Sequence, residues 1–385
     1  MQVSIIIDRT KGDTRAFDAA SIGAAARQIA GVEPDEPLRF MDGFAHLTSS
    51  LDTEARLTDA GRRSARAALV KSLVTQLEVR RMLRSQPELA QTPIQPIVIT
   101  GLLRSGTTFL QQLLAQHPGL RAPALWELMA PASPRKPSHL VADGESYVEE
   151  YYRAAPDFRS IHPLDARQPE ECHRLTANSF RHFIFGLRYR VPSYVRWLRA
   201  QPMAEAYRFH REQLSCLLAR EPGDPVLLKC PSHLWHLDAL AQVYPGAKVV
   251  RLHRRASVSL PSVASLTAVV RAARSAAVDP AEIGAYWLEE AAPVLDSMRR
   301  GVGPLRTPPL DIRFTDLTAD PLRVAGQVCD YAGVPMTEQA TARMTAFLSG
   351  ATGKPGNHRY RAQDFGLSAQ LLDERFARYH SEFDL

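Results

Sequence analysis

The segment Pro96-Ile-Val-Ile-Thr-Gly-Leu-Leu-Arg-Ser-Gly-Thr-Thr108 joins an apolar run to a loop with a glycine at each end. The four β-branched residues 97–100 follow prolines 93 and 96, which is the pattern of a short buried strand. Directly after the loop, Phe109-Leu110 and Leu113-Leu114 recur at helical spacing. This stretch therefore predicts a strand, a loop over 101–108 and a helix, in that order.

Three further apolar runs predict the rest of a sheet. Residues 226–229 and 248–252 are expected to be buried strands with a helix over about 233–243 between them, and 310–314 supplies a fourth strand. Strands joined through helices form right-handed parallel units. The fold class is therefore α/β, a three-layer fold of the kind that carries a phosphate loop, with a central parallel sheet flanked by helices.

The regions outside these strands have different patterns. Apolar residues recur at helical spacing over about 52–90, so residues 1–92 are expected to form a mainly helical N-terminal extension to a domain over 93–385. Residues 3–7 have the composition of a short strand, to which the sequence assigns no role. Prolines and aromatic residues alternate over 134–200, which suits an insert that covers an acceptor, although peripheral helices would give the same pattern.

Composition excludes several classes of function. The 385 residues carry a net charge of +6, and no block of consecutive Lys or Arg resembles a nucleic-acid-binding arm, so we expect an anionic small molecule as partner and no nucleic acid. No apolar run is long enough for a membrane span, and the N-terminus does not resemble a signal peptide, so we expect a cytoplasmic protein. The four cysteines, whose spacing indicates neither disulfides nor a zinc site, are expected to be free thiols.

The loop between Gly101 and Gly106 has the G-x-x-x-x-G spacing of a nucleotide-binding phosphate loop. Its amides and the following helix N-terminus can cradle a phosphate. In nucleoside triphosphatases a Lys follows the second glycine and an acidic residue helps to hold magnesium. Here Thr107 takes the place of that Lys, and the strand over 248–252 runs into His253 and Arg254. The loop therefore predicts a 5'-phosphate ligand and no metal, unless it is an ordinary strand-to-helix turn.

Three more residues are expected at the same sheet edge. Arg254 follows one strand and Ser262 lies eight residues further on, while Lys229 ends another strand. Ligands of open α/β folds bind at the carboxyl ends of the strands. Taken singly, an Arg or Lys at a strand end is often only a solvated charge, but together with the loop these residues predict a site for a phosphorylated nucleotide.

These segments, with Gln116-His-Pro118, Trp126-Glu-Leu128 and Leu228-Lys-Cys-Pro-Ser-His233, resemble sulfotransferases that use 3'-phosphoadenosine 5'-phosphosulfate (PAPS), particularly bacterial members with a phosphate loop. The resemblance covers roughly 96–365. It implies an EC 2.8.2-type enzyme that transfers a sulfuryl group from PAPS to a hydroxyl or amine of a small-molecule acceptor and releases adenosine 3',5'-bisphosphate.

The resemblance also implies roles for particular residues. The 5'-phosphosulfate would be held by Arg104, Ser105, Gly106, Thr107 and Thr108, and the 3'-phosphate by Arg254 and Ser262. A basic segment over the nucleotide would consist of Lys354, His358 and Arg359. Arg104 and Lys229 would stabilise charge on the sulfuryl and bridging oxygens. Aromatic residues over 180–197 favour an acceptor with an apolar or aromatic body, although core packing explains them as well.

The sequence does not decide which residue is the base that takes the acceptor's proton. Cytosolic sulfotransferases have a catalytic His two residues after the strand-end Lys, and Pro231 stands there in this chain. Glu127 is the candidate by its resemblance in spacing to the catalytic Glu of tyrosylprotein sulfotransferases, and a residue capping a helix start is the alternative. His233 is the second candidate and is equally explained as a structural hydrogen-bonding residue. His162, Glu170 and Glu171 are candidates for contacts with the acceptor.

The sequence leaves two alternative functions to be considered beside sulfuryl transfer. A kinase or triphosphatase with a phosphate loop would depend on ATP and magnesium, which Thr107 and the missing acidic ligand oppose. A catalytically silent nucleotide-binding protein would have no reason to keep Arg104, Lys229, Arg254 and Ser262 together.

Overall fold

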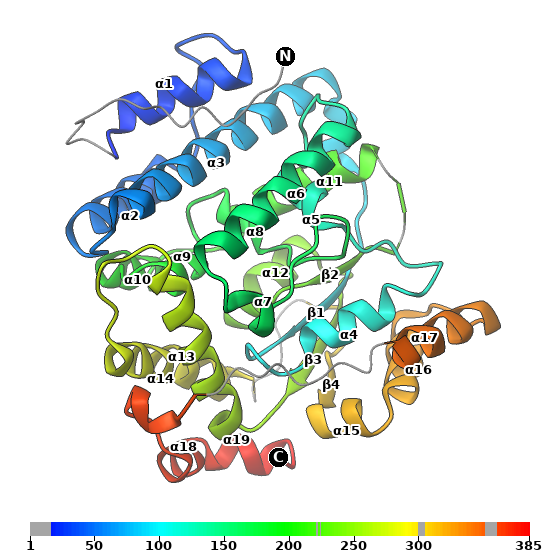
Figure 1. Cartoon of the computed structure of the whole chain (residues 1–385). Coiled ribbons are helices and arrows are strands. Elements are labelled where there is room, and N and C mark those ends of the chain that lie inside the picture. Colours follow the sequence, from blue (N-terminus) through cyan, green and yellow to red (C-terminus); the bar gives the residue numbers. More distant parts are fainter. Residues whose placement is uncertain (1–16, 221, 224, 299–304, 351–359) are drawn as a thin grey trace.

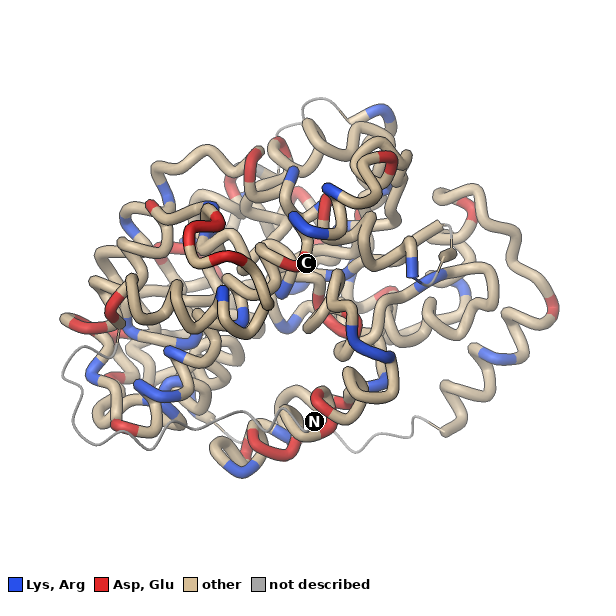
Figure 2. The backbone as a smooth tube through the Cα atoms, turned by 90° about the horizontal axis from the view of Figure 1, so that it is seen from above, with Lys and Arg blue, Asp and Glu red and all other residues tan. Residues whose placement is uncertain are grey.

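A computed structural model describes residues 17–220, 222–223, 225–298, 305–350 and 360–385. The segment 3–7, considered above as a strand, lies outside these residues. None of the helices within the described ranges is both long and apolar enough to cross a membrane. Figure 2 shows Lys and Arg interspersed with Asp and Glu over the fold.

A four-stranded parallel sheet forms the centre of the molecule (Figure 1). Its strands are β1 (Ile97–Gly101), β2 (Leu227–Lys229), β3 (Lys248–His253) and β4 (Leu310–Arg313), in the order β2-β1-β3-β4. The register pairs Ile99 with Lys229 and Gly101 with Leu252. All four predicted strands are confirmed, and the parallel register brings the ends of β1, β2 and β3 to one edge of the sheet.

Side chains of β1 alternate between two apolar cores, one on each face of the sheet. Ile97 and Ile99 pack with Leu110 of α4 (Thr107–Leu114) and with helices α16 (Pro321–Ala332) and α17 (Glu338–Gly350). Val98 belongs to the larger core on the opposite face. Because successive strand residues point to opposite faces, this division confirms the three-layer α/β fold.

The N-terminal part is helical and continuous with the larger core. It consists of α1 (Ala19–Ala30), α2 (Met41–Thr53) and α3 (Asp59–Ser85), and α3 is a single helix over most of the region in which apolar residues recur at helical spacing. Leu73 of α3 and Leu228 of β2 belong to the same buried cluster. Figure 1 shows these helices on the opposite side of the molecule from α18 (Ala369–Arg375) and α19 (Ala377–Glu382).

The region over about 134–200 that was expected to cover an acceptor is helical and packs over the larger core. Its helices are α6 (Pro137–Ala154), α7 (Phe158–Ile161), α8 (His173–Ala177), α9 (Ile184–Arg188) and α10 (Pro192–Arg199), with α5 (Leu125–Met129) before them and α11 (Ala204–Arg220) after them. Phe180 and Tyr194 are fully buried. Much of the aromatic content of this region therefore serves packing.

The remaining elements connect the strands and close the larger core. They are the 3₁₀ helices η1 (Pro87–Gln91), η2 (Pro231–His236) and η3 (Ala362–Phe365), with α12 (Leu237–Val243), α13 (Ala256–Ala272), α14 (Pro280–Ser297) and α15 (Phe314–Ala319). The helix expected over 233–243 thus begins as a 3₁₀ turn, in which the Cys230 sulfur accepts a hydrogen bond from the Ser232 N–H.

Close backbone contact between α14 and η3 yields a test of the packing. A Cβ on Gly284 would lie 1.9 Å from the Phe365 carbonyl oxygen, whereas a Cβ on Gly326 in α16 meets nothing within 4 Å. We expect Gly284→Ala to destabilise the protein by about 1–3 kcal/mol through overpacking. The matched Gly326→Ala should stabilise it by about 0.5–1 kcal/mol. Equal effects in urea unfolding would contradict the α14–η3 packing.

Candidate active site

The loop after β1 requires an unusual backbone. Gly106 has φ +95° and Arg104 has φ +71°. A Cβ on Gly106 would lie 3.0 Å from the Phe314 ring, so glycine is needed for conformation and for space. Strain of this kind at a non-glycine residue is typical of functional sites. The loop turns directly into α4, whose first turn has no side-chain cap.

Two guanidinium groups and a serine predicted to act together do lie together. Arg104 Nε donates a hydrogen bond to Ser262 Oγ at 3.2 Å, and an Arg254 Nη donates to the Arg104 carbonyl oxygen at 2.7 Å. The Arg254 guanidinium lies 3.9 Å from the centre of the Phe314 ring. The loop of β1 and the start of α13 thus meet at one place.

No carboxylate among the described residues forms an ion pair with the guanidinium groups of Arg104 and Arg254, although the more distant charge of Glu171 acts to raise the pKa of Arg104. Burial lowers the pKa of both, and the charge of Arg104 lowers the pKa of Arg254 further. An anion bound between them would relieve this repulsion.

Lys229 lies on the other side of the loop, fully buried at the end of β2. Its Nζ donates to Thr108 Oγ1 at 3.2 Å and to a Glu171 carboxylate oxygen at 2.7 Å. Burial alone would lower the lysine pKa, but the negative charge of Glu171 outweighs it and raises that pKa. Lys229 therefore stays charged beside the first turn of α4.

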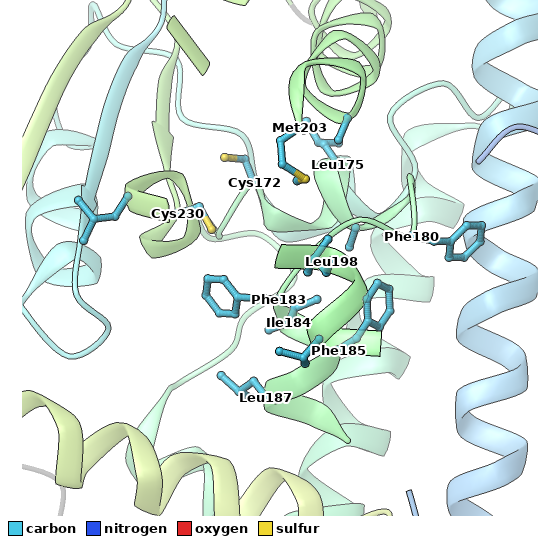
Figure 3. Packing of buried hydrophobic residues seen from close by; sticks show 14 of the residues in the cluster. Cys172, Leu175, Phe180, Phe183, Ile184, Phe185, Leu187, Leu198, Met203 and Cys230 are labelled. Atoms are coloured by element: carbon cyan, nitrogen blue, oxygen red, sulfur yellow. The ribbon is translucent and has the colours of Figure 1, made fainter. Parts of the chain in front are cut away.

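A cavity that is open to solvent adjoins this pair. Its walls are mostly apolar and aromatic, with Tyr147, Tyr151, Phe158 and Phe183 among them. Figure 3 shows Phe183 and its neighbours of α9 within the packed core. A second hollow is lined by Thr108 and Lys229. Both hollows share Leu164 and Glu170, so the apolar cavity leads to the phosphate loop.

Two pairs of acid and base groups line the apolar cavity. His162 Nε2 lies 3.4 Å from a Glu170 carboxylate oxygen, and His173 Nδ1 lies 3.2 Å from Glu171. Burial opposes ionisation of Glu170, but the charge of His162 lowers its pKa to about 2. Burial lowers the pKa of His173 to about 4. The carboxylates are therefore charged and His173 is neutral near pH 7.

The two bases predicted from sequence do not line the cavity. The Glu127 carboxylate contacts the Arg121 guanidinium and accepts a hydrogen bond from the Ala124 N–H at 2.7 Å, which is the capping arrangement considered as its alternative. His233 is buried, with its two ring nitrogens at 3.1 Å from Cys172 Sγ and 2.8 Å from the Tyr207 hydroxyl. Lys354, His358 and Arg359 lie outside the described residues.

Some residues of this arrangement had no signal in the sequence. Phe314 directly follows β4, and its ring lies against the Arg254 guanidinium. His173 lines the cavity and contacts the Glu171 carboxylate. A single aromatic residue or histidine in a helix is common in any core, so nothing in the sequence separates these two from packing residues.

Comparison with known proteins gives a consistent result. The profile of a family described as the sulfotransferase family matches residues 96–338. The solved structure of sulfotransferase STF1 from Mycobacterium tuberculosis H37Rv is 26% identical, with a TM-score of 0.76 over 94% of this chain and 98% of that one. Sulfotransferase STF9 from Mycobacterium avium, 22% identical, has the same fold, with a TM-score of 0.85 over 97% and 98%. No curated protein matches significantly.

The pKa of Glu170 predicts a specific dependence of stability on pH. Its pKa in the folded state, about 2, is below that of an unfolded glutamate, about 4.3. The ionised carboxylate therefore stabilises the fold above that unfolded value, and this contribution is lost as pH falls towards 2. Between about pH 5.5 and about pH 3.5 the wild type should lose about 1 kcal/mol more unfolding free energy than Glu170→Gln. Parallel losses in urea titrations would show that Glu170 is not held charged.

Proposed function

Because this chain belongs to the sulfotransferase family, we propose that it transfers a sulfuryl group from PAPS to a hydroxyl or amine of a small-molecule acceptor. The observation that carries the proposal is the grouping of Arg104, Arg254 and Ser262 beside an uncapped helix N-terminus. Lys229 adds a buried positive charge on the far side of the same loop. Such a site suits an anion with two separated phosphate groups.

The free groups of the loop fit this ligand. Ser105 Oγ is buried and makes no hydrogen bond within the described residues, and the first-turn amides of α4 are uncapped. We assign residues 104–108 to the 5'-phosphosulfate and Arg254 with Ser262 to the 3'-phosphate. Bound PAPS supplies a sulfuryl group activated by its link to phosphate. The role of the chain is to position it and to neutralise charge on the leaving phosphate through Arg104 and Lys229.

We further propose that His162, rather than Glu127, takes the acceptor's proton. Arg104 donates a hydrogen bond to the Ile161 carbonyl oxygen at 3.0 Å, which fixes His162 next to the phosphate loop. His162 Nδ1 makes no hydrogen bond within the described part of the chain, while Glu170 lies at Nε2. A carboxylate so placed orients an imidazole and stabilises the imidazolium that forms when it accepts a proton.

The walls of the cavity favour an acceptor with an apolar or aromatic body. Its hydroxyl or amine would point to the polar end, where Glu170 and Lys229 meet the loop. All four cysteines are free thiols, as expected, and free thiols favour the reducing cytoplasm as the site of action.

Nucleotide preference tests the proposal against its rivals. Adenosine 3',5'-bisphosphate should raise the thermal unfolding temperature, because at a hundredfold excess over Kd a ligand adds about 2.7 kcal/mol to the folded state. ATP with magnesium should have a much smaller effect. Stabilisation by ATP with magnesium alone would overturn the proposal in favour of a kinase or triphosphatase.

A paired substitution tests the 3'-phosphate assignment. Arg254→Ala should weaken binding of adenosine 3',5'-bisphosphate by about tenfold to a hundredfold and leave 5'-AMP nearly unchanged, because it removes one charge-assisted contact. Arg255→Ala is the matched control, since this exposed neighbour pairs with Asp373 instead. Equal losses for both nucleotides in calorimetry would refute the assignment.

Kinetics test the base, once a screen of phenols, sterols, sugars and amines has identified an acceptor. His162→Ala should lower kcat by about 10²- to 10⁴-fold without changing affinity for the product nucleotide. Glu127→Gln should keep kcat within about threefold, since its carboxylate caps a helix. An inactive Glu127→Gln with an active His162→Ala would return the role to Glu127.

A further inference from the structure

Three side chains that can bind a metal ion come together from the start of α8, from α11 and from η2. Cys172, His210 and His233 each offer one ligand atom, and these atoms lie within 4.8 Å of one another. All three side chains are essentially inaccessible, with exposures of 0%, 1% and 1%. Cys172 Sγ lies 3.1 Å from His233 Nε2. Figure 3 shows Cys172 beside the buried apolar side chains of the core.

A tyrosine hydroxyl forms a hydrogen bond with the Nδ1 atom of each imidazole. Tyr207 Oη lies 2.8 Å from His233 Nδ1, and Tyr244 Oη lies 2.8 Å from His210 Nδ1. With Nδ1 engaged in each ring, Nε2 is left as the atom available for a ligand. Metal-binding histidines are generally held in this way by a hydrogen bond to the second ring nitrogen.

One atom of the cluster has no partner. His210 Nε2 is buried and makes no hydrogen bond within the described residues. A thiol hydrogen bond between Cys172 and His233 satisfies those two groups but leaves His210 Nε2 alone, at a cost of about 1–3 kcal/mol. A ligand shared by all three atoms removes this cost.

The charge state of the rings suits a cation. Burial lowers the pKa of His210 to about 3 and also lowers the pKa of His233, so both rings keep a lone pair. Burial raises the pKa of Cys172, so its thiol carries a proton that a metal must displace. A second group, Glu171, His173 and Cys230, is less suitable because the Lys229 ammonium already neutralises Glu171.

We propose that Cys172, His210 and His233 bind one Zn²⁺ ion in a buried site with three protein ligands. One thiolate and two imidazoles form a ligand set that suits zinc, which tolerates mixed sulfur and nitrogen donors. As the zinc–sulfur bond forms, the thiol proton leaves to solvent, and both imidazoles bind as neutral donors. This proposal does not depend on sulfuryl transfer.

The ion would also hold the active site together. The Cys172 N–H donates to the Lys229 carbonyl oxygen at 3.0 Å, and His233 follows Lys229 in the adjoining 3₁₀ turn. Zinc would therefore clamp the segment that carries Glu171 onto the strand that carries Lys229. Its loss should loosen that ion pair.

Metal analysis of the protein, purified without a polyhistidine tag, tests the proposal. The wild type should contain about one zinc per chain by mass spectrometry, and Cys172→Ser and His210→Gln less than about 0.2. Cys216→Ser is the matched control, because Cys216 is equally buried but lies outside the cluster. It should retain about one zinc per chain.

Protein from cells grown with Co²⁺ gives a second measurement that needs only folded variants with a native circular dichroism spectrum. A thiolate-to-cobalt charge-transfer band should appear in the wild type and in Cys216→Ser, and should be absent from Cys172→Ser. Wild-type protein with less than about 0.2 zinc per chain, or with copper in its place, would overturn the proposal even if every variant failed to fold.

Discussion

Two positively charged guanidinium groups, held close together with no ion pair among the described residues, are the constraint on which this site depends. Arg254 donates to the carbonyl oxygen of Arg104, and Arg104 itself sits at positive φ. Keeping like charges so close costs free energy in the protein alone, and an anionic ligand compensates for it. The glycine at 106 and the stacked Phe314 follow from this arrangement, because the loop must pass close to the ring that supports Arg254.

The Lys229–Glu171 ion pair links this anion site to the cavity. Lys229 ends a buried strand, whereas Glu171 belongs to the helical region that covers the sheet. A buried pair of this kind contributes little net stability but fixes relative position, since removing one partner leaves an unpaired buried charge. The proposed zinc site behind it, joined through Cys172, would act on the same two segments.

The sequence predicted the sheet well because its strands are short apolar runs, and those of β1, β2 and β3 are almost entirely buried. The parallel register then brought Arg104, Lys229, Arg254 and Ser262 to one edge, as topology requires. Strand patterns and topology did not identify the base that accepts the acceptor's proton. A glutamate among apolar residues at the start of a helix gives the same sequence pattern whether it caps the helix or acts as a catalytic base. Only the structure shows that Glu127 pairs with Arg121. His162 and Glu170 become a pair only when α7 packs over the loop.

A crystal structure of the protein with adenosine 3',5'-bisphosphate tests the central claim most directly. The account predicts the 5'-phosphate on the amides of residues 105–108 and the 3'-phosphate in contact with both the Arg254 guanidinium and Ser262 Oγ. Binding should also break the hydrogen bond between Arg104 Nε and Ser262 Oγ, because the 5'-phosphate competes for the Arg104 guanidinium and the 3'-phosphate competes for Ser262 Oγ. A nucleotide bound elsewhere, or one whose 3'-phosphate points to solvent, would contradict it.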